Sequence, residues 1–247
     1  MRALFLGFLL LAAAPALAAD KHVGGNTDVR TILAFKAADA AVKKVLPEDW
    51  ELDVATTGPA KDVNLRLTFI DRLSAQDADG KALPQVRNVT LSVPAKKKAS
   101  EVRGTMLFLV YTSGGSGGPY GVSVHADTKT ERKVAIDPAG TASVEEAWQF
   151  QAPDGNSIQL QIQYSRGAPA PAKAESLLYS AVKPGFYRIY RYEQSADVVR
   201  GAGVDRVQKV VIKAAGPKLA PLLDGSEQLL GVTSVPWYAR QTYLPGS

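Results

Sequence analysis

The sequence predicts a mostly β protein, either a barrel or a pair of curved sheets, with one or two short helices. About a dozen short segments in the last four fifths of the chain alternate apolar and polar residues, which is the period of a half-buried strand. The segment VNLRLTFI at 63–70 is the clearest, because its apolar residues all fall on one face. Turn signals such as Asp154-Gly155 separate the segments. Many short strands joined by tight turns are typical of barrels and sandwiches.

The N-terminal region predicts export. Arg2 is followed by an apolar stretch over 3–14, and Ala16-Leu17-Ala18 is a small-x-small cleavage site, so residues 1–18 are interpreted as a signal peptide. An uncleaved membrane anchor is the less favoured alternative. After cleavage we expect a periplasmic or secreted protein without stable membrane insertion. Residues 19–29 are polar and glycine-rich and are expected to be a flexible lead-in, and 30–247 to form a single β-barrel domain.

One stretch near the N-terminus allows two interpretations. Within 31–46, apolar side chains share one helical face, and Pro47 ends that pattern. Alternatively, 30–35 is a strand and the helix begins near Ala37. The Pro/Ala stretch at 168–172 is expected to be an extended surface loop, and 218–223 a helical turn. The expected strands are 63–70, 86–93, 104–111, 122–124, 134–136, 144–150, 158–164, 177–182, 187–192, 207–212, 229–235 and 237–244.

Composition excludes several classes of function. The chain has no cysteine, which rules out disulfides, thiol catalysis and cysteine metal sites. With only two histidines we expect no metal and no cofactor, and His125-Ala-Asp127 is interpreted as a surface pair. The formal net charge is +5. The one basic run, at 96–98, is interpreted as a solvated loop, and we expect no nucleic-acid partner.

The glycine-rich run YTSGGSGGPYG at 111–121 has the Gly-x-Ser-x-Gly spacing of a hydrolase nucleophile elbow around Ser116. That motif needs a helix after the serine, as does a phosphate-binding loop. The residues after Pro119 instead indicate a strand. We therefore interpret the run as a flexible hairpin loop.

The order of segments along 30–245 resembles that of the acetoacetate decarboxylase family. The matching pieces are a helix ending in Leu-Pro, a strand ending in aromatic-x-Asp, a strand ending in Val-Pro, a Gly-led apolar strand with a late Tyr, and a late strand followed by Gly. They lie at 37–50, 67–71, 91–94, 104–111 and 209–223. The resemblance implies a β-barrel that holds a small carboxylate or ketone, and a lysine that forms a Schiff base with it.

The family motif Gly-Arg-Glu followed by Pro-Lys-Lys is absent after the apolar strand, where the glycine-rich run stands instead. The nearest supply of these residue types is Glu131-Arg132-Lys133. A neighbouring cation and a dry pocket lower the pKa of a lysine and make it a nucleophile. The resemblance therefore points to Lys133 as the catalytic lysine, with Arg132 and Glu131 as polar pocket groups and Tyr111 as a lining residue.

Two functions remain open from the sequence. One is an exported acetoacetate-decarboxylase-like protein that binds a small carboxylate or carbonyl compound, with Schiff-base chemistry of a decarboxylase-like lyase. The alternative is a non-catalytic periplasmic binding or envelope-associated β protein that has lost the catalytic lysine motif. An unrelated β-sandwich adaptor is a third interpretation. Whether the protein is an enzyme and whether it forms a homo-oligomer are left open.

Overall fold

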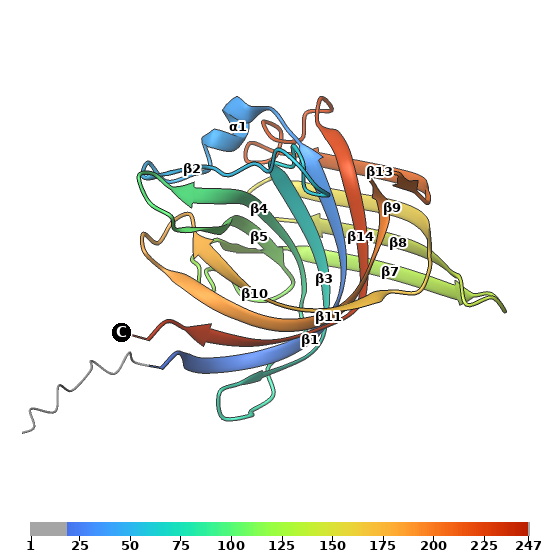
Figure 1. Ribbon diagram of the computed structural model, residues 1–247, viewed down its shortest axis with the longest axis horizontal. Coiled ribbons are helices and arrows are strands. Elements are labelled where there is room, and N and C mark those ends of the chain that lie inside the picture. Colours follow the sequence, from blue (N-terminus) through green and yellow to red (C-terminus); the bar gives the residue numbers. More distant parts are fainter. Residues whose placement is uncertain (1–18, 247) are drawn as a thin grey trace, which may run out of the picture.

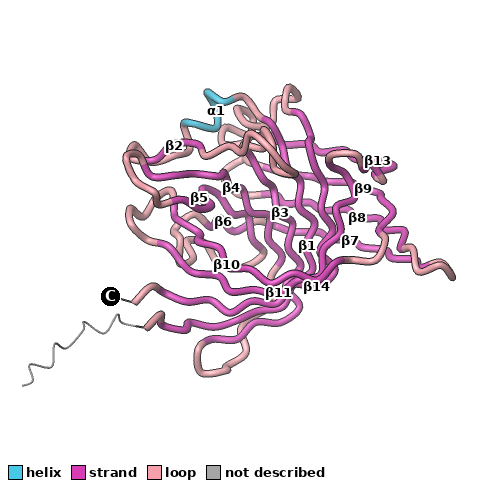
Figure 2. The backbone as a smooth tube through the Cα atoms, in the orientation of Figure 1, coloured by secondary structure: helices cyan, strands magenta, loops and turns pink. Residues whose placement is uncertain are grey.

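The computed structural model describes residues 19–246 and is built almost entirely of strands (Figures 1 and 2). One short helix, α1 (Asp39–Lys43), lies at one end of the molecule. The prediction of a mostly β fold with one or two short helices is confirmed. The predicted signal peptide, 1–18, lies outside the described residues.

The strands follow one another along the chain with short connections. They are β1 (Lys21–Lys36), β2 (Trp50–Leu52), β3 (Leu65–Asp77), β4 (Arg87–Lys97), β5 (Arg103–Thr112), β6 (Ser123–His125), β7 (Asp127–Ile136), β8 (Ala142–Gln151), β9 (Ser157–Arg166), β10 (Ala170–Ser180), β11 (Tyr187–Gly201), β12 (Val204–Asp205), β13 (Val207–Ala215) and β14 (Gln228–Leu244).

The first sheet closes on itself. Its order is β2-β4-β3-β1-β14-β11-β10-β5-β6, and β5 also pairs with β4. The pairings therefore run in a circuit from β4 through β3, β1, β14, β11, β10 and β5 back to β4. The junction of β10 with β5 is short and parallel, whereas the other pairings of the circuit are antiparallel. The result is a barrel with no unpaired edge in the circuit.

The second sheet, of order β13-β9-β8-β7, packs against the outside of this barrel (Figure 1). Its apolar face meets the outward faces of β3, β1 and β14. Phe69 of β3 lies 5.7 Å from Trp148 of β8 between ring centroids. Large side chains at this interface, including Phe69, Trp148, Phe150 and Leu160, are at most 2% exposed. The main hydrophobic core of the protein therefore lies between the two sheets.

A buried carboxylate joins the sheets within this core. Glu146 of β8 has a side chain that is 1% exposed. It accepts hydrogen bonds from Thr31 Oγ1 at 2.8 Å, from Trp148 Nε1 at 2.7 Å and from the Tyr164 hydroxyl at 2.9 Å. The Arg132 guanidinium lies 3.4 Å away. Because a buried charge is costly unless its hydrogen bonds are made, this complete set of donors fixes the position of one sheet on the other.

The N-terminal part of β1 corrects the prediction of a flexible lead-in at 19–29. Strand β1 begins at Lys21 and pairs with both β14 and β3. Gly24 has a φ of +133°, and a Cβ there would lie 2.4 Å from the Gln76 carbonyl oxygen. The glycines in this region thus permit close strand packing, whereas composition alone suggested slack.

The observed element boundaries decide between the alternatives that the sequence left open elsewhere in the chain. Residues 30–36 are strand and the helix begins at Asp39, as the second interpretation of 31–46 proposed. The Pro/Ala stretch is not a loop, because β10 begins at Ala170 and pairs with β11. Residues 218–223 form a turn with an i→i−4 bond from the Leu223 N–H. The turn at Asp154-Gly155 between β8 and β9 is confirmed, with Gly155 at φ +80°.

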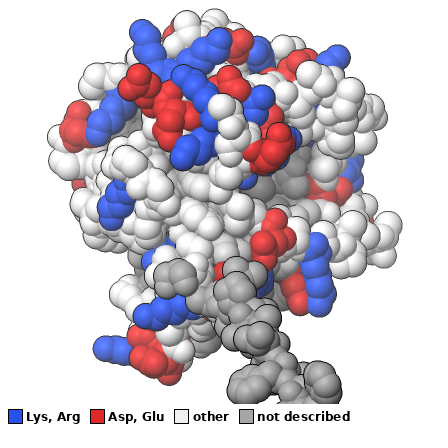
Figure 3. Space-filling view, turned by 60° about the vertical axis from the view of Figure 1, so that its left-hand side comes forward, with Lys and Arg blue, Asp and Glu red and all other residues white. Residues whose placement is uncertain are grey.

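The basic run at 96–98 is neutralised by acidic and carbonyl groups next to it. Lys96 pairs with Glu51 at 3.2 Å and Lys97 with Asp49 at 3.6 Å. Figure 3 shows that positive and negative side chains are interspersed over the upper part of the surface in that view, rather than gathered by sign. None of the helices within 19–246 has the length and apolar character needed to cross a membrane.

The glutamate between the sheets gives the first prediction. Glu146→Ala leaves the donors of Thr31, Trp148 and Tyr164 unpaired and buried, so we expect the free energy of unfolding to fall by about 3–5 kcal/mol. Urea denaturation followed by tryptophan fluorescence measures this. Glu145→Ala is the control, because its exposed side chain lies on the opposite face of β8 and should change stability by less than about 0.5 kcal/mol. Equal effects of the two substitutions would contradict the role given to Glu146.

Candidate functional site

Strand β7 places the three predicted site residues on two different faces. Glu131 and Lys133 are exposed on the outer face of the second sheet, where they border a hollow of about 170 Å³. Arg132 points the other way, toward the core. Alternation along a strand explains this separation, because successive side chains point to opposite faces. The structure therefore brings Glu131 and Lys133 together and separates both from Arg132.

Arg132 and Tyr111 both pack into the core of the protein, and neither lines a pocket with Lys133. Arg132 is 17% exposed, lies 3.5 Å from Asp71 and 3.4 Å from Glu146, and its guanidinium carbon is 5.5 Å from the centre of the Trp148 ring. Tyr111 of β5 is fully buried in the core between the sheets, and burial raises the pKa of its hydroxyl. Neither residue lies near Lys133 in a common pocket.

The lysines of the described chain are all at least partly solvated. Within 19–246 no lysine is buried, and the two that are half-buried, Lys36 and Lys96, are 37% and 40% exposed and paired with Asp39 and Glu51. A Schiff-base lysine depends on a dry site that favours its neutral amine. The described residues therefore offer no lysine in the surroundings that this chemistry requires.

The interior of the barrel carries a different set of residues. On β1, Thr31 and Leu33 point to the second sheet, so Arg30 and Ile32 point inward. The same alternation continues through the pairing registers of the circuit. Several inward side chains are only partly buried even though strands close around them, so solvent reaches the interior. These side chains are Ile32, Arg66, Thr68, Thr90, Leu178, Arg188 and Tyr192.

Arginines and tyrosines from four strands and one loop meet in this interior. We call this group the interior cluster. Its members are Asn26, Asp28 and Arg30 of β1, Arg72 of β3, Tyr120 of the loop after β5, Arg188, Tyr190 and Tyr192 of β11, and Tyr238 and Arg240 of β14.

Two stacks organise the cluster. The Arg240 guanidinium lies 3.9 Å above the Tyr190 ring, and the Tyr120 hydroxyl donates to the Tyr190 hydroxyl at 2.9 Å. In the second stack, Arg30 lies 3.3 Å above the ring of Tyr238. Strands β11, which carries Tyr190, and β5, which precedes the loop with Tyr120, are separated by β10, so these side chains meet over the inner face of β10. Guanidinium–aromatic stacking of this kind contributes about 0.5–2 kcal/mol per pair.

The glycine-rich run supplies Tyr120 to the cluster. Gly117, Gly118 and Gly121 have positive φ values, which lets the loop turn back sharply toward the barrel. The Tyr120 side chain is 5% exposed, and its carbonyl accepts a hydrogen bond from Ser180 Oγ at 2.6 Å. The expectation of a flexible hairpin loop is therefore wrong, because β5 and β6 on either side of the run pair in parallel. The loop is anchored, and it carries an aromatic side chain into the interior.

Positive charge exceeds negative charge in the cluster. Four arginines face one aspartate, Asp28, whose side chain is 1% exposed. Asp28 pairs with Arg30 at 2.5 Å and lies 3.9 Å from Arg72. In the described part of the chain, Arg188 and Arg240 have no carboxylate partner, and Arg240 Nε donates instead to Asn26 Oδ1 at 2.7 Å. The Nε atoms of Arg72 and Arg188 are buried without a hydrogen-bond acceptor.

The pKa shifts reflect the same crowding. Burial lowers the pKa of Arg72, and the neighbouring Arg240 lowers it further, against the opposing influence of Asp28. Burial raises the pKa of Tyr120, and Tyr190 adds to the rise, whereas Arg240 and Arg188 act in the opposite direction. Tyr120 therefore lies within the electrostatic reach of both arginines. A site with this excess of guanidinium groups favours an anion.

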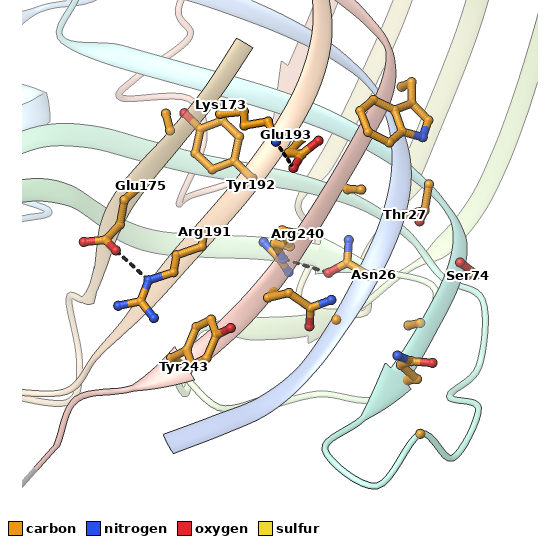
Figure 4. A pocket seen from close by; sticks show the side chains of 18 of the residues that line it. Asn26, Thr27, Ser74, Lys173, Glu175, Arg191, Tyr192, Glu193, Arg240 and Tyr243 are labelled. Atoms are coloured by element: carbon orange, nitrogen blue, oxygen red, sulfur yellow. Dashed lines mark hydrogen bonds and ion pairs between the residues drawn. The ribbon is translucent and has the colours of Figure 1, made fainter. Parts of the chain in front are cut away.

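A groove of about 920 Å³ runs along β1, β3, β10, β11 and β14, and it is lined by outer-face side chains together with Asn26, Tyr192 and Arg240 of the interior cluster (Figure 4). Its outer-face charged side chains are paired with one another. Lys173 bonds Glu193 at 2.6 Å, and Arg191 bonds Glu175 at 2.8 Å. Figure 4 also shows the Arg240–Asn26 hydrogen bond, which belongs to the interior cluster. Because the outer charges of the groove are paired whereas Arg188 and Arg240 have no carboxylate partner in the described chain, the interior cluster, which the groove reaches at Arg240, is the stronger candidate site.

The fold is that of acetoacetate decarboxylases. No protein-family model and no curated protein matches the sequence. Among solved structures, the enduracididine biosynthesis enzyme MppR complexed with pyruvate is similar, with a TM-score of 0.57 and 10% identity over 92% of this chain and 90% of that one. An acetoacetate decarboxylase-like enzyme from Sphingomonas wittichii RW1 gives 0.52 and 10%, over 98% of each chain. Acetoacetate decarboxylase from Legionella pneumophila gives 0.51 and 12%, over 100% and 97%.

Sequence reasoning missed the interior cluster. The run Arg188-Ile-Tyr-Arg-Tyr192 alternates charged and aromatic residues, which predicts a strand but does not tell which face is inside. An available signal was that Arg188, Tyr190 and Tyr192 fall on one face while Ile189 falls on the other. A face of polar and aromatic residues is compatible with a solvated interior as well as with an outer surface, and the other face carries the exposed Arg191 beside Ile189.

The cluster predicts opposite effects of two substitutions on stability. Asp28→Asn removes the only carboxylate among four arginines and should lower the free energy of unfolding by about 3 kcal/mol. Arg72→Met relieves repulsion with Arg240 and should leave stability unchanged or raise it by up to about 2 kcal/mol. Urea unfolding of both variants at low ionic strength tests this. A loss for Arg72→Met as large as that for Asp28→Asn would show that Arg72 has a structural role.

Proposed function

We propose that the protein binds a small organic carboxylate inside its barrel. The observation that carries this proposal is the unneutralised arginine group of the interior cluster. Arg188 and Arg240 have no ion-pair partner within the described chain, and the Nε atoms of Arg72 and Arg188 have no acceptor. Keeping such groups buried without an anion costs stability, which natural proteins accept mainly at functional sites.

Carboxylate is the class of ligand that fits best. Guanidinium groups bind carboxylates through paired hydrogen bonds, and the stacked rings of Tyr190 and Tyr238 hold two of the guanidiniums flat. The hydroxyls of Tyr120 and Tyr190 add polar groups beside them. MppR, whose fold is similar, has been solved with pyruvate bound, which supports a small organic acid as ligand. At 10% sequence identity, the similarity of the two proteins is one of fold.

Binding without lysine chemistry is the version we favour. The exposed position of Lys133 and the absence of a buried lysine within 19–246 do not support a Schiff base. Of the two functions left open by the sequence, these observations favour the non-catalytic binding protein over the decarboxylase-like lyase. We further propose, from the N-terminal sequence, that the protein is exported and binds its ligand in the periplasm or outside the cell.

Binding is tested by calorimetric titration with a panel of organic acids that includes pyruvate and acetoacetate. We expect saturable binding that weakens with salt, and a loss of about tenfold or more in affinity for Arg240→Met, because a charged hydrogen bond is removed. Arg191→Met is the matched control, since Arg191 is an exposed arginine on the outer face of β11. If no organic acid of the panel binds the wild-type protein, the proposed function is wrong.

The absence of Schiff-base chemistry is tested by trapping. The protein is incubated with acetoacetate or pyruvate, reduced with borohydride and digested, and lysine adducts are mapped by mass spectrometry. We expect no stoichiometric adduct on any lysine, because exposed lysines remain protonated at neutral pH. A single stoichiometric adduct that is lost in Lys133→Ala would restore the lyase hypothesis.

A further inference from the structure

The arginines of the interior cluster form a row rather than a point. Arg240 lies in the middle, because its guanidinium stacks on Tyr190 and its backbone position is two residues from Tyr238. Tyr238 and Arg72 are the partners of Asp28 on the two neighbouring strands. Arg188 lies at the other end. It is four residues from Tyr192, the backbone partner of Arg240, and two residues from Tyr190, on whose ring the Arg240 guanidinium stacks. The backbone position of Arg188 is therefore about 7 Å from that stack along the strand direction.

One carboxylate is too small for such a row. Its two oxygens can take the paired donors of one guanidinium, or single donors of two. Arg72, Arg240 and Arg188 are held by strands β3, β14 and β11. The phenol of Tyr120 bonds to the hydroxyl of Tyr190, the ring on which Arg240 stacks. A monocarboxylate bound at Arg240 therefore leaves the charge at Arg188 uncompensated.

From this arrangement we propose that the ligand is an organic acid with at least two carboxylates, one held at Arg72 and Arg240 and the other at Arg188 beside Tyr120. This inference rests on the proposed function and deepens it, because it names the class of acid. Asp28 already neutralises one of the four arginines, so a dianion leaves the cluster closer to neutral than a monoanion does.

The glycine-rich loop then has a part in recognition. Tyr120 is the one member of the cluster that comes from a loop, and its hydroxyl points to Tyr190 at 2.9 Å. Because Tyr190 carries the Arg240 guanidinium on its ring and lies two residues from Arg188 on the same face, the phenol of Tyr120 lies close to both proposed carboxylate positions. A hydroxyl there can donate to a ligand oxygen in place of its bond to Tyr190.

The test compares matched acids by calorimetric titration at constant ionic strength: malonate, succinate and glutarate against acetate, propionate and butyrate. At least one dicarboxylate should bind about tenfold or more tightly than its monocarboxylate counterpart, since a second charged contact is made. Arg188→Met should bring that ratio close to one while monocarboxylate binding persists. Arg191→Met, on the opposite face of the same strand, should leave the ratio unchanged.

A second variant keeps the test valid if Arg188→Met fails to fold by circular dichroism. Arg188→Lys retains the charge and should retain most of the preference for dicarboxylates. Equal affinity for the two series would overturn this inference and leave carboxylate binding in place. Tighter binding of phosphate monoesters than of any dicarboxylate would overturn the assignment of the ligand class. If neither series binds, the proposed function fails together with the inference.

Discussion

The second sheet covers the outward faces of β3, β1 and β14, so the hydrophobic core of the protein lies outside the barrel wall. Phe69, Trp148 and Phe150 fill that interface, and the Glu146 carboxylate fixes it with donors from both sheets. Because these strands bury their apolar side chains outward, their inward side chains are free to be polar. A barrel that had to supply the main core from its own interior could not also hold the arginines of the interior cluster there.

The interior cluster and the interface between the sheets handle charge in opposite ways. The Glu146 carboxylate accepts hydrogen bonds from the groups around it and needs no ligand to compensate its charge, so its role is structural. Arg72 and Arg188 have buried nitrogens without acceptors, and only Asp28 opposes the positive charge around them. The first arrangement stabilises the fold by itself. The second becomes favourable when an anion supplies the missing acceptors, which is the physical distinction between a scaffold and a binding site.

Much of the fold could be predicted from sequence, whereas the site could not. The alternation at 63–70 and the apolar run at 104–111 correspond to β3 and to a β5 buried on both faces. The glycines near residue 24 led to the wrong prediction of a flexible segment. Glycine is common in flexible segments, but it also occurs where two strands pack closely. Lys133 was chosen by its neighbours along the chain, but the neighbours on β7 alternate between faces, so adjacency in sequence separated Lys133 from Arg132 in space.

The sequence by itself determined the strand content, the turns, the absence of thiol chemistry and the resemblance to acetoacetate decarboxylases, since these follow from local pattern and composition. Only the tertiary structure decided which face of each strand is inside. A period of two is the same whether its polar face meets bulk water or a closed interior. The arginines at 72, 188 and 240 are distant in sequence and unremarkable one by one. They come together because closure of the circuit through β5 and β10 turns their faces toward one another.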